Sequence, residues 1–192
     1  MQVEQRVPDP IDARVIRACQ DGDREAFRLL FEAYKDRVFS IASYSLGNEA
    51  AADDVTQQIF VKLFTCIGQF RGESDFTTWL YRLVINSCLD ERRRRQRFLP
   101  VEEFTDRSKT VHMRPAETRY ERREIAGSVR EAIGGLKPKM RLPILLKYIE
   151  GLSYEEIAAV LGCSKGTVAS RLNRAHKALA RKLGHLRGEL EL

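Results

Sequence analysis

A basic stretch without acidic residues near the C-terminus carries side chains that could bind nucleic acid. From Cys163 to Arg187 the sequence has seven Lys or Arg and no Asp or Glu. Helical spacing would bury Val168 and Leu172 and turn a polar face outward. Guanidinium, amide and hydroxyl groups on such a face can reach base edges and phosphates in a major groove. The outward residues are Lys165, Thr167, Ser170, Arg171, Asn173 and Arg174.

The residues before this face predict a helix–turn–helix. Ser153 and Glu156 have the spacing of a capping box, which marks the start of a helix. Gly162 permits the positive φ of a tight turn, and Ser164 can cap the basic helix. A plain corner between two helices with a solvated basic face also fits this pattern. The capping box, the small Ala158, the glycine turn and the lack of acids together favour DNA binding.

A second set of candidate residues lies earlier in the chain. "FRGESDFTTWLYRLVIN" is rich in aromatic residues, and it is followed by a segment in which five of the seven residues from Glu91 to Arg97 are arginine. Aromatic rings can stack on unpaired bases, while arginine follows the phosphate backbone. Trp79 fits a core position equally well, and the arginine run fits a solvated helix end.

Other kinds of chemistry find no support in the sequence. Asp53 and Asp54 are adjacent, and neighbours on a helix diverge by about 100°, which is unsuited to general acid–base work. The four cysteines and three histidines lack the spacing of zinc ligands. A phosphate-binding glycine loop and a nucleophile–base pair are also missing. We therefore expect no catalytic residue, no metal and no cofactor.

Apolar residues recur at helical spacing through most of the chain, so the predicted fold is all-α. Asp23 can cap one long helix and Gly47 can end it. After Arg97 the periodicity weakens, and prolines and polar residues indicate a linker. We predict two small helical domains, residues 11–97 and 118–187, joined by a flexible linker over residues 98–117, with the helix–turn–helix in the second domain.

The overall composition is compatible with a protein that binds a polyanion. The chain has 192 residues and a formal net charge of +6. It contains no apolar run long enough to cross a bilayer, and "MQVEQRVPDP" lacks the apolar core of a signal peptide. We expect a cytoplasmic protein without a membrane segment.

Four stretches, in this order, resemble the small two-domain sigma factors of the extracytoplasmic-function class. They are "DREAFRLLFEAYKDRVFSIA", "ADDVTQQIFVKLF", "FRGESDFTTWLYRLVINSCLDERRRR" and "GLKPKMRLPILLKYIEGLSYEEIAAVLGCSKGTVASRLNRA". The likeness covers roughly residues 11–97 and 117–185. It implies a protein that binds core RNA polymerase, directs it to promoters in a stress or envelope response, and is held by an anti-sigma factor.

The resemblance also implies roles for single residues. Docking on the clamp helices of the polymerase's largest subunit would use Asp54, Gln57, Gln58, Phe60 and Lys62. A base flipped from the non-template strand would enter the loop 71–78, and the −10 element would meet Arg71, Ser74, Phe76, Trp79, Tyr81, Asn86, Arg92, Arg93, Arg94 and Arg95. The −35 duplex would meet Ser164, Lys165, Thr167, Ser170, Arg171, Asn173, Arg174 and Lys177.

An alternative from another functional class is a conventional helix–turn–helix regulator. Its N-terminal helices would dimerise or sense a ligand, and it would bind duplex DNA without polymerase. Transcription with purified core enzyme separates the two hypotheses, because only a sigma factor creates new start sites.

Overall fold

The computed structural model describes residues 11–98, 127–129 and 131–184. Within this part of the chain the regular elements are all helical, as predicted, and none of the helices is long and apolar enough to cross a membrane. The predicted linker over residues 98–117 lies outside the described residues except for Phe98.

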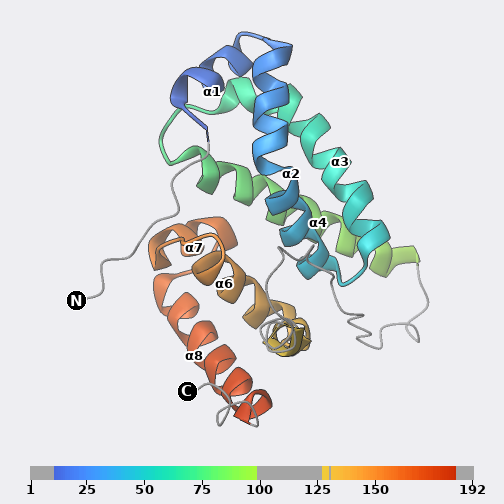
Figure 1. Cartoon of the computed structure of the whole chain (residues 1–192), viewed down its shortest axis with the longest axis vertical. Coiled ribbons are helices and arrows are strands. Elements are labelled where there is room, and N and C mark those ends of the chain that lie inside the picture. The colour runs from blue at the N-terminus through green and yellow to red at the C-terminus, as the bar shows by residue number, and fades with distance from the viewer. Residues whose placement is uncertain (1–10, 99–126, 130, 185–192) are drawn as a thin grey trace.

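The N-terminal domain contains four α-helices and a short turn. Their bounds are α1 (Ala13–Gln20), α2 (Arg24–Leu46), α3 (Glu49–Cys66), the 3-10 turn η1 (Ile67–Gln69) and α4 (Phe76–Phe98). The C-terminal group includes α6 (Pro138–Tyr148), α7 (Tyr154–Leu161) and α8 (Lys165–Lys182), and residues 127–129 and 131–134 before them are also helical. Figure 1 shows α1 to α4 in one half of the molecule and α6 to α8 in the other.

Local signals set the helix boundaries, as the sequence predicted. The Asp23 carboxylate accepts hydrogen bonds from the Glu25 and Ala26 N–H groups (2.8 and 3.1 Å), which caps α2. Gly47 ends that helix with φ +68°, a conformation that strains residues with a Cβ.

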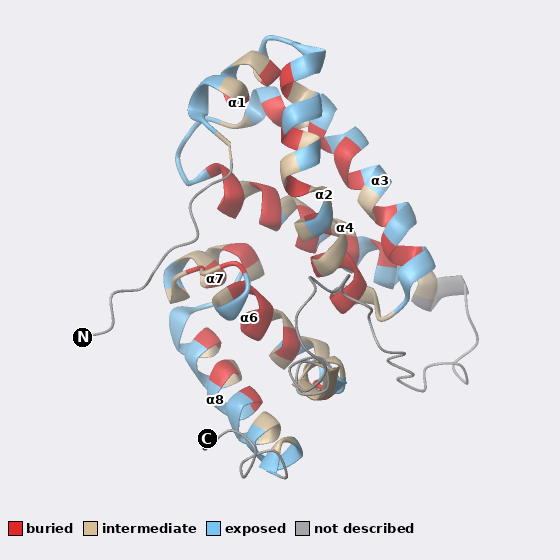
Figure 2. Cartoon of the chain, in the orientation of Figure 1, coloured by how far each residue is buried: buried red, intermediate tan, exposed pale blue. Residues whose placement is uncertain are grey.

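The cores follow the predicted apolar stripes. Buried residues of α2, α3 and α4 belong to one apolar cluster, and Figure 2 shows the buried, red parts of these ribbons mainly on the sides that face the neighbouring helices. The predicted stripe is buried along its whole length, and α3 faces α2 and α4. It consists of Ala52, Val55, Ile59 and Leu63 on α3 and Ile67 at the start of η1.

The predicted helix–turn–helix is confirmed. The Ser153 Oγ accepts from the Glu156 N–H (3.2 Å), and the Glu156 carboxylate accepts from the Ser153 N–H (2.7 Å). Gly162 follows α7 with φ +59°, which lets the chain turn directly into α8. Val168 and Leu172 are 0 and 1% exposed, so they hold α8 on the domain core.

The two domains pack directly on each other, which the sequence did not predict. Helix α2 contacts α6, and α4 contacts α7. The Arg141 side chain is 2% exposed and spans the contact. Its Nη1 donates to the Tyr44 carbonyl (2.9 Å), while Nε and Nη2 donate to the Leu136 carbonyl (3.1 and 2.7 Å). A guanidinium can be buried here because carbonyls from both domains accept its protons.

A second polar contact lies between α4 and the end of α6. The Tyr81 hydroxyl donates to the Glu150 carboxylate, and Arg37 Nε lies 3.9 Å from the same oxygen. Burial raises the pKa of Glu150 despite the opposing effects of Tyr81 and Arg37. Burial also raises the pKa of Tyr81, with the Glu150 charge adding to the effect, so the phenol stays a donor. Tyr81 therefore joins the domains.

Candidate nucleic-acid interface

Helix α8 presents a polar face away from its buried side. The Ser164 Oγ accepts from the Thr167 N–H (3.2 Å) and so starts the helix. The exposed side chains of this face can meet base edges and phosphates because the opposite side of the helix is held in the core. Among the predicted −35 residues, the exposed ones are Ser164, Lys165, Ser170, Asn173, Arg174 and Lys177.

Two predicted −35 residues are less available. Thr167 is half-buried. Arg171 is also half-buried; its Nη1 lies 3.8 Å from the Cys163 Sγ, and the side chain lines a cavity between the domains together with Leu89 and Arg92. The rotation of α8 therefore turns Arg171 toward the other domain rather than fully outward.

Lys165 forms an ion pair with Glu155 on α7. The hydrogen bond from the Lys165 ammonium group lowers the pKa of the Glu155 carboxyl. Both side chains are exposed, so the pair adds little stability, and a phosphate can compete with Glu155 for the ammonium group.

The loop before α4 and the first turns of that helix enclose a cavity. Trp79 is half-buried and packs on Phe70 and Phe76, with ring centroids 5.5 and 5.9 Å away. Trp79 is therefore both a core contact and a cavity wall. The cavity has a volume of about 350 Å³ and is lined by Gln69, Phe70, Arg71, Glu73, Ser74, Trp79 and Arg82.

The predicted −10 residues divide between surface and core. Arg71, Ser74 and Asn86 are exposed, whereas Phe76 and Tyr81 are 2 and 0% exposed. Phe76 lies under Trp79 and Phe70, and Tyr81 bonds to Glu150 across the domain contact. In this arrangement neither buried ring can stack on a base, because helical rotation turns both rings inward.

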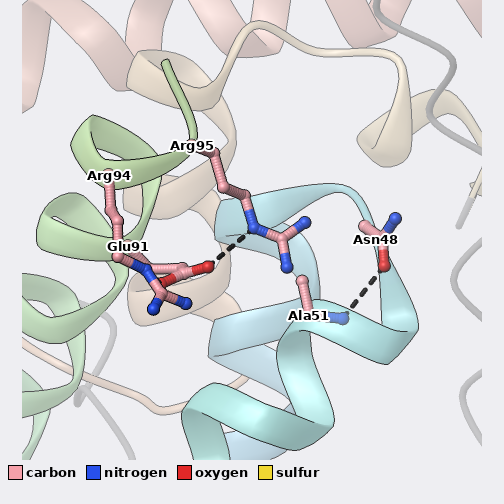
Figure 3. A network of polar contacts seen from close by, with 5 residues as sticks. All are labelled: Asn48, Ala51, Glu91, Arg94 and Arg95. Carbon is pink, nitrogen blue, oxygen red and sulfur yellow. Dashed lines mark hydrogen bonds and ion pairs between the residues drawn. The ribbon is translucent and has the colours of Figure 1, made fainter. Parts of the chain in front are cut away.

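The arginine run at the end of α4 is organised by a buried carboxylate. Glu91 is 6% exposed and accepts from Arg94 Nε (2.8 Å) and Arg95 Nε (2.7 Å). Figure 3 shows the three side chains and the bond from Arg95. Both hydrogen bonds lower the pKa of the Glu91 carboxyl, and the bond from Arg94 has the larger effect. Arg93 pairs with Asp90 at 3.3 Å. Glu91 was not among the residues predicted from the sequence, although its i+3 and i+4 spacing to two arginines was a usable signal.

Helix α3 offers a surface of a different kind. Its exposed hollow is lined by Asp54, Gln57, Gln58, Val61, Lys62 and Thr65. Four of these are predicted polymerase-binding residues, and the structure brings them together. The fifth, Phe60, is 5% exposed and packs edge-on against Phe31 (4.7 Å), so it supports the hollow from below.

Two exposed apolar residues of α3, Val61 in the lining of this hollow and Phe64, were not predicted from the sequence. Val61 and Phe64 are 68 and 47% exposed, although they are large hydrophobic side chains. Exposed apolar surface next to polar groups is typical of a protein-binding site. The signal was present in the sequence, because both residues fall outside the apolar stripe of α3.

The described residues contain no cluster of three metal-ligating side chains. Burial raises the pKa of the Cys19 and Cys66 thiols and raises that of Cys88 to about 12, which keeps them poor nucleophiles. The helices described above present two basic surfaces, on α4 and α8, and one surface of mixed polar and apolar residues on α3.

Comparison with known families matches two separate regions of the chain. Residues 30–98 match the model described as Sigma-70 region 2, and residues 126–179 match the model described as Sigma-70, region 4. The first match contains α3 and α4, and the second contains α6, α7 and most of α8.

Curated relatives resemble the chain over most of its length. The RNA polymerase sigma-H factor of Pseudomonas aeruginosa is 34% identical over 180 residues, which cover 90% of this chain and 93% of the relative. The ECF RNA polymerase sigma-E factor of Escherichia coli K12 is 33% identical, with 90 and 94% of the two chains covered.

Two solved structures share the arrangement of the helices. The sigma factor RpoE in complex with the anti-sigma factor NepR from Bartonella quintana gives a TM-score of 0.71 at 22% identity, covering 83% of this chain and 98% of that chain. At this identity the likeness is one of fold. CnrH in complex with the cytosolic domain of CnrY gives 0.62 at 27% identity, with 90 and 96% covered.

The Glu91 contacts predict a specific dependence of stability on pH. Because the pKa of Glu91 is lowered from 4.5, its carboxylate stabilises the fold above that pH, and the contribution disappears as the pH falls through the lowered value. We expect Glu91→Gln to reduce the free energy of unfolding by roughly 1–3 kcal/mol at pH 7, and the difference from wild type to shrink in acid. Urea titrations followed by circular dichroism at several pH values measure this.

Glu25→Gln is the matched control. Glu25 also pairs with an arginine, Arg28 at 2.9 Å, but its side chain is 77% exposed, so little stability should be lost at any pH. A constant difference between Glu91→Gln and wild type down to acid pH would contradict the assigned role of the Glu91 carboxylate.

Proposed function

Because the chain belongs to the sigma-70 family, in its extracytoplasmic-function class, we propose that it docks on core RNA polymerase through α3 and selects promoters through α4 and α8. The observation that carries this assignment is the order of the two matched sigma regions, each of which contains one of the basic surfaces. A sigma factor needs both surfaces, since polymerase holds them on separate promoter elements.

The α3 hollow is the proposed polymerase contact. Its carboxylate, amides and ammonium group offer directional bonds, and Val61 and Phe64 add apolar area beside them. We assign the docking on the clamp helices of the largest subunit to Asp54, Gln57, Gln58 and Lys62, with Phe60 as their buried support.

The cavity before α4 is the proposed site for a base from the melted −10 element. Phe70 and Trp79 supply aromatic walls, while Arg71 and Ser74 supply a charge and a hydroxyl. Unstacking a base costs a few kcal/mol, and binding of the flipped base offsets that cost. Asn86 and the arginines at residues 92–95 would contact the adjoining DNA.

The exposed face of α8 is the proposed −35 reader. Lys165, Asn173, Arg174 and Lys177 can contact bases and phosphates of a duplex as α8 lies. Arg171 would join them after a side-chain rotation away from the domain contact. The reading domain spans residues 118–187 in this proposal, and the polymerase-binding domain spans residues 11–97.

Regulation by a protein partner belongs to the same proposal. The two solved relatives described above are complexes, one with an anti-sigma factor and one with the cytosolic domain of another protein. We assign this chain a partner of that kind, which would cover its DNA-binding surfaces until a stress or envelope signal arrives. The chain would act in the cytoplasm, where polymerase meets the promoter, and would leave all catalysis to the polymerase.

Transcription with purified core enzyme tests the function. We expect this chain to create new start sites on a promoter library, with shared −35 and −10 sequences upstream of them. New start sites should not appear with core enzyme alone. A chain that leaves transcription unchanged but protects a palindromic duplex by itself would be a conventional regulator, and the proposal would be wrong.

Reversing the charge of Asp54 should weaken polymerase binding. Asp54 lines the α3 hollow, so Asp54→Lys should raise the Kd for core enzyme at least about ten-fold, as loss of an interfacial charge contact does. Asp53→Lys is the matched control, because the same charge change falls on an exposed residue about 100° away around the helix. Equal effects of the two changes would argue against docking through this hollow.

Removing the Arg174 side chain should weaken binding of the holoenzyme to −35 DNA. We expect Arg174→Ala to lower the slope of log affinity against log salt by about one if the guanidinium binds a phosphate. Arg28→Ala serves as control, since Arg28 is also exposed but lies on α2 and pairs with Glu25. An unchanged affinity and salt slope for Arg174→Ala would exclude this contact.

A further inference from the structure

One residue of the proposed base cavity belongs to two sites at once. Arg82 lines the cavity beside Trp79 and Arg71. Its Nε also donates a hydrogen bond of 3.1 Å to the carbonyl of Ala159, which lies on α7 in the other domain. Arg82 was not among the residues predicted from the sequence to contact DNA.

The bond to α7 has a clear physical basis. Ala159 lies in the last turn of α7, where carbonyl groups lack partners within the helix and the helix dipole is negative. The Arg82 guanidinium satisfies one such carbonyl. The closed packing of the domains is thus stabilised by a cation from the wall of the cavity.

We propose that Arg82 is a further DNA-binding residue of the base cavity, and that the packing of α7 on α4 withholds it from DNA. This inference rests on the function proposed above. A backbone phosphate of the captured nucleotide is the ligand, because guanidinium groups bind phosphate through two parallel N–H donors. Nε and the neighbouring Nη form one such pair, and the Ala159 carbonyl occupies Nε in the closed arrangement, so this pair becomes available to a phosphate only when α7 leaves.

The rest of the cavity is already in place before DNA arrives. Gln20 on α1 holds the floor, because its Nε2 donates to the Ile67 and Phe70 carbonyls (3.2 and 2.8 Å). Phe70 and Trp79 are held by their mutual ring contact. Separation of the domains would free the Arg82 Nε without breaking any of these contacts.

A reciprocal coupling follows from this competition. A phosphate carries a full charge and a carbonyl only a partial one, so a strand in the cavity favours release of α7. Release of α7, in turn, raises the affinity for the strand, since linkage acts equally in both directions. Capture of the −10 nucleotide and separation of the two DNA readers would thus support each other.

The test compares Arg82→Ala, Arg82→Lys and Glu150→Ala in the full chain. Glu150→Ala removes another contact of the closed arrangement but does not touch the cavity. Three quantities are measured: affinity for core enzyme, promoter melting by permanganate reactivity of unpaired thymines on a promoter from the transcription test, and the radius of gyration of the free chain by small-angle X-ray scattering.

We expect Arg82→Ala to bind core enzyme normally, to expand the free chain and to form about ten-fold less open complex. Arg82→Lys keeps the charge without the planar donors and should fall between Arg82→Ala and wild type. Glu150→Ala should also expand the free chain, but it should melt the promoter at least as well as wild type.

Three outcomes would overturn the inference. If Arg82→Ala melts the promoter as well as Glu150→Ala, Arg82 is only a domain contact. If Arg82→Ala lowers melting without expanding the free chain, the closed packing does not depend on Arg82 and the competition is wrong. If the wild-type chain itself does not bind core enzyme, the proposed function fails, and the inference fails with it.

Discussion

The surface of helix α4 is divided among the core of its own domain, helix α7 and, in the proposed function, DNA. One side carries Phe76, Leu80 and Val84 into the core against α2 and α3. Another side packs on α7, and what remains is free for DNA. Helix geometry fixes the direction of every side chain around the axis. Burial of one side of α4 therefore determines which of its side chains can reach DNA. The exposure of Asn86 and the burial of Tyr81 are consequences of the same rotation.

The contact between the domains includes buried polar groups beside its apolar residues. Arg141 and Glu150 are buried, yet both depend on partners from the opposite domain, the Tyr44 carbonyl and the Tyr81 hydroxyl. Buried charges are costly to bring out of water, and their bonds return only part of that cost. A contact of this kind is specific in its geometry without being strongly stabilising. That combination suits the separation of the two domains on a promoter that we propose.

Several predictions depended on interactions within a few residues, and the structure bears them out. The capping box of Ser153 and Glu156, the turn at Gly162 and the stripe of α3 each follow from contacts between positions three or four apart. The exposure of the candidate site residues was predicted less completely. Phe60 and Phe76 were assigned to binding but lie in the core, whereas Val61 and Phe64 were overlooked on the surface.

The sequence by itself determined the helices, their ends, their apolar faces and the order of the regions that mark a sigma factor, because these are properties of local spacing and residue type. Only the tertiary structure decided which polar groups are free. Tyr81 meets Glu150, and Arg82 meets Ala159, across more than 60 positions of the chain. Such pairs depend on how two domains pack, and helical periodicity carries no information about that packing.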